Sequence, residues 1–106
     1  MKEMKLDIHG RVYDMMFVPA THPKMTLDGE LCWGRALYGE SELLIDENIS
    51  EEKQKETALH EVLHAVDPDM EEDKILSLTH NLFAFIRHNP DFIEYISQCN
   101  LGVIDE

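Results

Sequence analysis

Residues 57–66 read TALHEVLHAV and contain an H-E-x-x-H pattern formed by His60, Glu61 and His64. On an α-helix, four residues turn the chain by about 400° and advance it by about 6 Å, so both imidazoles lie on one face and can bind one metal ion. Glu61 points about 100° away from His60, a direction that suits a base acting on metal-bound water better than a third ligand. This stretch therefore predicts a zinc-binding helix at the centre of the fold.

The same residue types specify a reaction. Zinc lowers the pKa of a bound water to about 7, and a neighbouring carboxylate can accept the proton that this water releases. The resulting hydroxide would attack a carbonyl group that the metal polarises. The pattern therefore predicts hydrolysis of an amide bond, with Glu61 as the catalytic base.

The surroundings of the pattern favour a helix packed inside the protein, because residues 57–66 contain no charge except Glu61. The alternative is that His60 and His64 lie at the surface of an ordinary amphipathic helix and bind no metal. On a helical wheel five apolar residues form one face, and the two histidines lie together outside it. We expect the apolar face to be buried. Its members are Ala58, Leu59, Val62, Leu63 and Val66.

A third metal ligand has to come from outside the pattern. Metzincins place a histidine six residues after the second one, but Met70 stands there, so this class is excluded. Pro68 cannot continue a helix and biases Asp67 out of the helical region. We expect a second helix to begin here, with Asp67 as its N-cap and Pro68 as its first residue.

Glu72 is the predicted third ligand. A carboxylate that faces a core costs several kcal/mol unless a cation meets it, and a zinc ion on the preceding helix would be that cation. The alternatives are that Glu72 interacts with the helix dipole and leans out to water, or that His80 is the ligand instead. His80 is more simply explained as a surface residue or a group near the substrate. Glu72 falls at the centre of a mostly apolar stripe formed by Ile75, Leu76, Thr79, Leu82, Phe83 and Ile86.

Over roughly residues 31–95, these features resemble the small zincin-type metallopeptidases related to ImmA/IrrE, including short phage and mobile-element members. Residues 42–46 look like the strand that precedes the active-site helix of the family, and residues 57–66 look like the helix itself. The run from Glu72 to Leu82 looks like the second helix, whose leading glutamate is the third zinc ligand in that family. The resemblance implies a zincin-like fold.

The resemblance also implies roles for particular residues. His60, His64 and Glu72 would hold one zinc ion per chain, and Glu61 would be the base. The implied partner is a peptide or protein substrate, in some lineages a regulator such as a repressor. The chain departs from related enzymes at Leu76, which stands where thermolysin-type enzymes place an aspartate. We also expect it to lack the large partner domain of longer members.

Composition bounds what else the chain does. Its 106 residues are 43% hydrophobic, which is enough for one core, so we expect a single domain over residues 1–106. A formal net charge of −13 would repel a phosphate backbone and argues against direct nucleic-acid binding. The charged start of the chain is unlike a signal peptide and no apolar run is long enough for a bilayer, so we expect a cytoplasmic protein without membrane contact. Cys32 and Cys99 lack C-x-x-C spacing and are expected to be reduced thiols in or near the core.

The chain divides into a strand-rich first half and a helical second half, which indicates an α+β fold. We expect a small antiparallel or mixed sheet packed against the metal-binding helix, followed by two further helices. Strands are predicted at residues 6–8 and 12–18, a loop at 22–29, and a hairpin from residues 33–38 and 42–45.

Both ends of the helical half have capping signals. Ser50 is the predicted N-cap of the metal-binding helix. A third helix is predicted to begin at Asn89-Pro90-Asp91 and to end at residues 100–102. We expect Phe92, Ile93 and Ile96 to form its buried side.

In zincin folds the edge strand beside the metal helix commonly receives the substrate as an added antiparallel strand. By that resemblance, we expect the substrate groove at the hairpin of residues 33–45. Trp33 and Tyr38 would line a side-chain pocket there, or Tyr38 would donate a hydrogen bond to an oxyanion, and His80 would lie nearby. Aromatic residues on strands are more commonly core residues, which is the competing interpretation.

Two functions are therefore open. The first is a zinc-dependent metallopeptidase with an open fourth coordination position. The second is a catalytically silent zincin scaffold, an anti-repressor or inhibitor-type binding module, with a structural metal or none. A fourth position filled by a protein group such as His80 or Asp69 would favour this second function, and an open one would favour hydrolysis. Zinc is the default for a mixed histidine and carboxylate set, with another transition metal as the alternative. Nothing in the sequence indicates the cleaved peptide or the oligomeric state.

Overall fold

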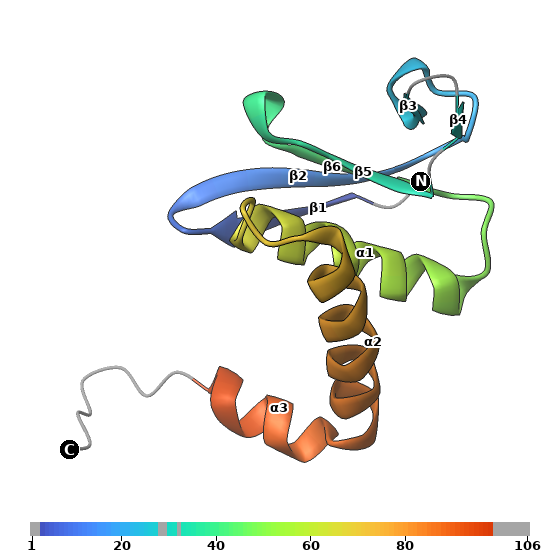
Figure 1. Ribbon diagram of the computed structural model, residues 1–106. Coiled ribbons are helices and arrows are strands. Elements are labelled where there is room, and N and C mark those ends of the chain that lie inside the picture. The colour runs from blue at the N-terminus through green and yellow to red at the C-terminus, as the bar shows by residue number, and fades with distance from the viewer. Residues whose placement is uncertain (1–2, 28–29, 32, 99–106) are drawn as a thin grey trace.

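The computed structural model describes residues 3–27, 30–31 and 33–98 (Figure 1). β1 pairs antiparallel with β2, β2 pairs parallel with β6, and β6 pairs antiparallel with β5, so the main sheet is mixed. The predicted α+β class, with a small mixed sheet, is confirmed. The sheet has four strands in the order β1-β2-β6-β5, namely β1 (Glu3–Ile8), β2 (Arg11–Val18), β6 (Glu42–Asp46) and β5 (Gly34–Leu37).

Two tight turns set the strand pairing. His9 and Gly10 join β1 to β2, and both have positive φ angles, 56° and 79°. A two-residue turn of this hand matches the twist of the paired strands, and glycine adopts it without a Cβ penalty. β5 and β6 form the predicted hairpin, which turns through a short 3₁₀ helix, η2 (Tyr38–Glu40), and Ser41.

The segment between β2 and β5 is not the simple loop that the sequence predicts. It contains a 3₁₀ helix, η1 (Pro23–Met25), and a small hairpin of β3 (Thr26–Leu27) and β4 (Glu30–Leu31). Met25 is fully buried and packs with Leu44. One buried methionine among polar residues produces no hydrophobic period, so the sequence pattern missed this structure.

The core forms around β6. Leu43, Leu44 and Ile45 have no exposed surface, so this strand is buried on both faces. One face joins a cluster with inward side chains of β2 and with Ala65 of the first helix, and the other face is covered by Met25. Burial on both faces explains why the sequence of β6 is an apolar run rather than an alternating one.

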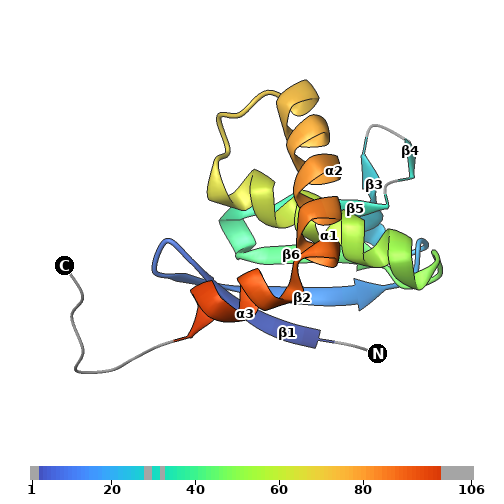
Figure 2. The same cartoon turned by 90° about the horizontal axis from the view of Figure 1, so that it is seen from below.

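The described residues form three α-helices, α1 (Glu51–Val66), α2 (Glu72–His88) and α3 (Pro90–Ser97). α1 lies along one face of the sheet, and α2 crosses α1 steeply and runs away from the sheet (Figure 1, Figure 2). Ser50 caps α1 as predicted, because its side chain accepts a hydrogen bond from the backbone N–H of Lys53. No helix in the described ranges combines the length and the apolarity that crossing a bilayer requires.

The link between α1 and α2 corrects one prediction. Asp67 ends α1, since its N–H donates to the carbonyl oxygen of Leu63 at 3.0 Å, and α2 begins only at Glu72 with Glu71 as its N-cap. The Asp67 carboxylate accepts a hydrogen bond from the N–H of Asp69, 3.3 Å away, which gives the link the appearance of a helix start. As a result, Glu72 is the first residue of α2 and not a residue of its second turn.

The predicted buried face of α1 is wrong in part. Val66 is 41% exposed, and the centre of the buried face lies elsewhere on the helix. The buried face of α1 is rotated about the helix axis from the predicted one, because α1 packs closely against Gly34 at the start of β5. The buried residues of α1 stand about one turn apart and are Thr57, Glu61 and Ala65.

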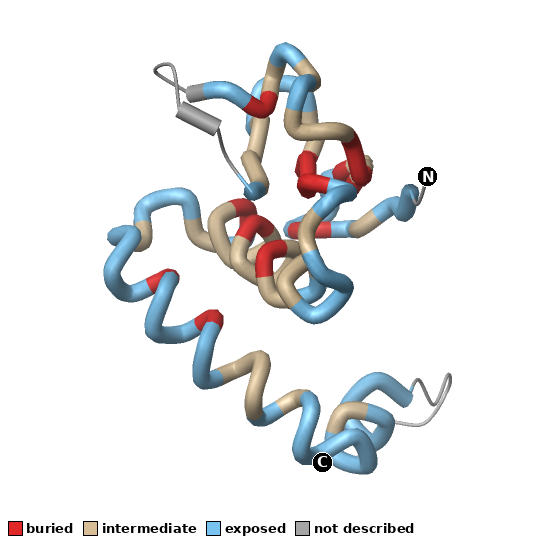
Figure 3. The backbone as a smooth tube through the Cα atoms, turned by 90° about the vertical axis from the view of Figure 1, so that its right-hand side faces the viewer, coloured by how far each residue is buried: buried red, intermediate tan, exposed pale blue. Residues whose placement is uncertain are grey.

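The predicted buried side of α3 is also wrong. Phe92 is 47% exposed, Ile96 is 58% exposed, and α3 has no buried residue. α2 carries α3 away from the sheet, so α3 packs mainly on the end of α2 (Figure 3). The rings of Phe85 and Phe92 meet there edge to face. The predicted helix end at residues 100–102 lies outside the described residues, as do Cys32 and Cys99.

Candidate metal centre

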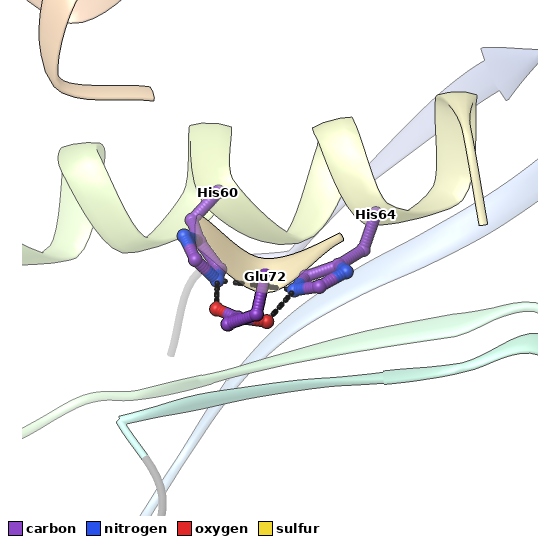
Figure 4. Close-up of side chains that lie close together, drawn as sticks. All are labelled: His60, His64 and Glu72. Atoms are coloured by element: carbon purple, nitrogen blue, oxygen red, sulfur yellow. Dashed lines mark hydrogen bonds and ion pairs between the residues drawn. The ribbon is translucent and has the colours of Figure 1, made fainter. Parts of the chain in front are cut away.

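His60, His64 and Glu72 converge where α2 begins beside α1 (Figure 4). The Nε2 atom of His60 lies 2.9 Å from Oε1 of Glu72, and the Nε2 atom of His64 lies 3.0 Å from Oε2 of Glu72. The two Nε2 atoms are 3.1 Å apart. The structure thus brings together the three residues that the sequence predicts as ligands. Metal binding by these residues stays a prediction.

The three side chains fit a transition-metal site. Tetrahedral zinc with bonds near 2.0 Å holds neighbouring donor atoms about 3.3 Å apart. The two Nε2 atoms are 3.1 Å apart, each lies about 3 Å from one oxygen of Glu72, and one ligand atom from each residue lies within 4.8 Å of the others. In the tautomer that binds metal, with no proton on Nε2, the two imidazole nitrogens and the carboxylate direct lone pairs at one another, and a shared cation would offset this repulsion. The donor set suits zinc and other transition metals that accept imidazole and carboxylate.

The two histidines are mostly buried, whereas Glu72 is not. Their side chains are 16% and 20% exposed, and that of Glu72 is 56% exposed. Burial is the largest cause that lowers the pKa of His60; Glu72 opposes this shift and His64 adds to it. The neutral imidazole that this favours is the form that binds metal. The prediction that Glu72 faces the core is wrong, because its place at the start of α2 lets it reach the histidines from the solvent side.

Glu61 lies on the buried face of α1, beside Gly34 of β5, and is 6% exposed. Burial raises its pKa to about 7, and the nearby charge of Glu72 adds to the rise. Within the described residues no cation offsets these two causes. A carboxyl group that titrates near neutral pH can both accept and release a proton under physiological conditions, which is the requirement for a general base.

Gly34 makes the burial of Glu61 possible. A Cβ atom at this position would lie 2.6 Å from Cγ2 of Thr57 and 3.0 Å from Oε2 of Glu61. The strand and the helix therefore approach this closely only because residue 34 has no side chain. A glycine inside a strand pattern is the sequence signal for such an approach, although it does not reveal what approaches.

Replacing Gly34 by alanine is expected to lower the free energy of unfolding by about 1–3 kcal/mol, because the added methyl group overlaps the Thr57 side chain and displaces Glu61. Urea denaturation followed by circular dichroism measures the change. Gly39→Ala is the matched control, since a Cβ there meets no atom within 4 Å. Equal stability of the Gly34→Ala variant and the unmodified chain would contradict the tight contact.

The raised pKa of Glu61 predicts how the stability of the metal-free chain depends on pH. The folded state holds the Glu61 proton up to about pH 7, whereas an ordinary glutamate releases it near 4.5. The contribution of Glu61 to the free energy of unfolding is therefore fully present below pH 4.5 and is lost as the pH rises to about 7, since the folded state binds more protons in this window. The rise in pKa from 4.5 to about 7 corresponds to a loss on the order of 3 kcal/mol.

Comparison with Glu61→Gln isolates this effect, because both chains share every other titrating group. With a chelator present, the variant is expected to match the unmodified chain near pH 4.5 and to exceed its unfolding free energy progressively up to pH 7.5. Urea denaturation across this pH range gives the difference. A difference that is independent of pH would show that Glu61 titrates normally in the folded chain.

His60, Glu61 and Glu72 line a cleft of about 500 Å³ between the start of β5, α1 and α2. Trp33 lines the same cleft and is 56% exposed, so the interpretation of this residue as core is wrong. His80 also lines the cleft, as expected of a group near the substrate.

The positions of Tyr38 and His80 in the structure differ from those that their other predicted roles require. Tyr38 does not line the cleft; its hydroxyl group donates to the carbonyl oxygen of His64 at 3.2 Å and so supports the last turn of α1. Burial is the largest cause that raises the pKa of Tyr38, followed by the charge of Glu61. The His80 side chain is 80% exposed and its Nδ1 lies 3.7 Å from Oε2 of Glu56. His80 lies outside the ligand cluster, so its role as the rival third ligand is not supported.

α1 also contributes Lys53, Glu56 and Thr57 to the cleft wall, and the sequence predicted no site role for these residues. Thr57 stands four residues before Glu61, and Glu56 stands four residues before His60. Residues at this spacing share a helix face. A helical wheel of α1 therefore places Thr57 beside Glu61 and Glu56 beside His60, once Glu61 is known to be buried. On the facing helix, Thr79 is buried and its hydroxyl group has no hydrogen-bond partner among the described residues.

No family model, curated protein or solved structure matches this chain. The resemblance to the ImmA/IrrE-related peptidases therefore depends on the H-E-x-x-H helix and on the glutamate that opens the next helix.

Proposed function

We propose that this chain is a zinc-dependent metallopeptidase with a zincin-like fold, which hydrolyses peptide bonds in a protein substrate. One observation carries the proposal: His60, His64 and Glu72 converge at a cleft, and the buried Glu61 lines the same cleft with a pKa near 7. A metal-binding triad alone would fit many functions. A carboxyl base with a near-neutral pKa beside that triad favours hydrolysis.

Each residue of the site would have a separate role in hydrolysis. His60, His64 and Glu72 would hold the metal, which when bound would polarise the substrate carbonyl and acidify the attacking water. Glu61 would accept a proton from the attacking water and pass it to the leaving amine. Burial raises the pKa of Glu61 to about 7 in the metal-free chain. A bound cation would lower it again and so favour the carboxylate form that accepts the proton.

The strand β5 supplies a place for the substrate backbone. It is the last strand in the sheet order, and Gly34 at its start lines the cleft. The N–H of Asp46 donates to the carbonyl oxygen of Trp33, so the backbone groups of Trp33 face β6. Antiparallel pairing alternates, which turns the backbone groups of Gly34 and Ala36 toward the free edge. A peptide that adds here as an antiparallel strand would pass along the cleft.

For the alternative function, a silent binding module with a structural metal or none, a fourth metal position closed by His80 or Asp69 would be favourable evidence. The cluster found in the described residues contains only His60, His64 and Glu72. This arrangement favours the peptidase.

The proposal is tested on the full chain purified without added metal. Elemental analysis is expected to find about one zinc per chain, and fluorescently labelled, denatured casein is expected to be cleaved. A chelator should stop cleavage, and stoichiometric zinc should restore it. One zinc per chain without cleavage of casein or of a diverse peptide library would refute the peptidase and support the binding module; absence of zinc would refute both the metal site and the mechanism.

A further inference from the structure

Two large apolar side chains are exposed inside the cleft. Trp33 is 56% exposed and Leu76 is 54% exposed, and both line the cleft that contains Glu61. Leu76 belongs to the stripe of α2 that the sequence predicts to be buried, so its exposure is a departure from that pattern. Apolar surface left open to water in a concave site is typical of a surface that binds a ligand.

These two side chains stand on different walls. Trp33 immediately precedes β5, whereas Leu76 lies on α2, and α1 forms the floor between them. Both are close to the reacting groups. Gly34, the neighbour of Trp33, is in contact distance of Glu61, and Leu76 follows Glu72 by one helical turn. A side chain placed between the two walls would therefore belong to a residue next to the bond being cleaved.

The indole ring of Trp33 is held in place. The Nζ atom of Lys53 lies 4.3 Å from the centroid of the ring, and the same Nζ is 3.3 Å from Oε1 of Glu56. The indole ring of Trp33 therefore already makes a cation–π contact with Lys53, and the ammonium group of Lys53 is already paired with the Glu56 carboxylate. What this wall offers a ligand is apolar surface.

The charges around the cleft exclude one class of side chain. Glu56, Glu61 and Glu72 all line it, and the positive charge of Lys53 is already paired with Glu56. Among the described residues that line the cleft, an aspartate or glutamate of the substrate would find no unpaired lysine or arginine. The volume of about 500 Å³ accommodates the side chain of a phenylalanine or leucine together with the adjoining backbone.

We propose that Trp33 and Leu76 form a specificity subsite that binds a large apolar side chain, aromatic or branched aliphatic, of the residue next to the cleaved bond. This inference rests on the proposed peptidase function for its catalytic consequence. The binding itself requires neither the metal nor hydrolysis, so the two proposals can fail separately.

Cleavage specificity provides the first test. The zinc-loaded full chain is incubated with an equimolar library of diverse peptides, and the cleaved bonds are mapped by mass spectrometry. We expect enrichment of Phe, Tyr, Leu and Met at one position beside the cleaved bond, reduced about tenfold in Trp33→Ala and in Leu76→Ala. Leu78→Ala and Tyr95→Ala are matched controls, since both residues are exposed and lie outside the cleft, and they should retain the enrichment. Cleavage without this preference, or with a preference for Lys and Arg, would overturn the subsite while leaving the peptidase intact.

Fluorescence provides the second test, which does not depend on activity. Trp33 is the single tryptophan of the chain, so its emission reports on the cleft directly. N-acetyl-phenylalaninamide and N-acetyl-leucinamide are expected to shift this emission saturably, at concentrations about tenfold below those needed with N-acetyl-alaninamide. The Leu76→Ala variant should lose this difference, and Leu78→Ala should keep it. An equal response to the alanine and phenylalanine compounds would overturn the subsite even if no peptide were cleaved.

Discussion

Replacing Glu61 by glutamine is expected to slow peptide hydrolysis by about 10²- to 10⁴-fold, the range that a positioned general base contributes. Glutamine has nearly the shape of glutamate but cannot accept the proton of the attacking water. Its neutral amide also fits the buried position of Glu61, which is only 6% exposed, so the fold should be retained. The rate is measured on labelled casein, and the zinc content is measured on the same sample.

The zinc content distinguishes a base from a ligand. It should remain at about one ion per chain in Glu61→Gln, because Glu61 is not part of the His60, His64 and Glu72 cluster. Glu51→Gln removes an exposed acid from the first turn of the same helix and is expected to leave the rate unchanged. Full activity in Glu61→Gln would remove the base from the mechanism, and loss of zinc in that variant would make Glu61 a structural partner of the metal site instead.

Replacing Glu72 by alanine is expected to weaken zinc binding by at least about 100-fold, because loss of an outer partner of a metal ligand already costs 10- to 100-fold and a direct ligand contributes more. Both carboxylate oxygens of Glu72 are engaged, at 2.9 Å from His60 and 3.0 Å from His64. The substitution should not unfold the chain, since the Glu72 side chain is 56% exposed. Competition with a chromogenic chelator measures the affinity.

The adjacent residue supplies the control for this experiment. Glu71 is exposed, makes no side-chain capping hydrogen bond and lies outside the ligand cluster, so Glu71→Ala should bind zinc as the unmodified chain does. His64→Ala should lose zinc as Glu72→Ala does. Unchanged affinity in Glu72→Ala would mean that the carboxylate only pairs with protonated histidines and that the predicted third ligand is wrong.

The local features of the chain could be predicted from the sequence because each depends on neighbouring residues. The spacing of His60 and His64 places them on one side of a helix whatever surrounds it, and Ser50 caps that helix through its own side chain. The turn at His9 and Gly10 and the strands on either side of it likewise follow from local backbone preferences.

Predictions that depended on packing were less accurate. The wheel of α1 placed the buried face on Leu59, Leu63 and Val66, but hydrophobicity alone does not show that a glycine on a distant strand opens a space for Thr57 and Glu61. Glu72 was selected as a ligand because it interrupts an apolar stripe, yet its side chain is half exposed. The residue was identified through an argument about burial that the fold does not support.

The sequence by itself determined the pair of imidazoles, the acid between them and the α+β order of the elements, since these follow from helical geometry and local propensity. Only the tertiary structure decided that Glu72 meets both histidines and that burial raises the pKa of Glu61 to about 7. It also decided that Trp33 and Leu76 line the same cleft. The physical reason is that desolvation and convergence depend on contacts between β5, α1 and α2. Those contacts join residues such as Gly34 and Glu61, 27 positions apart in the chain, and no local pattern records them.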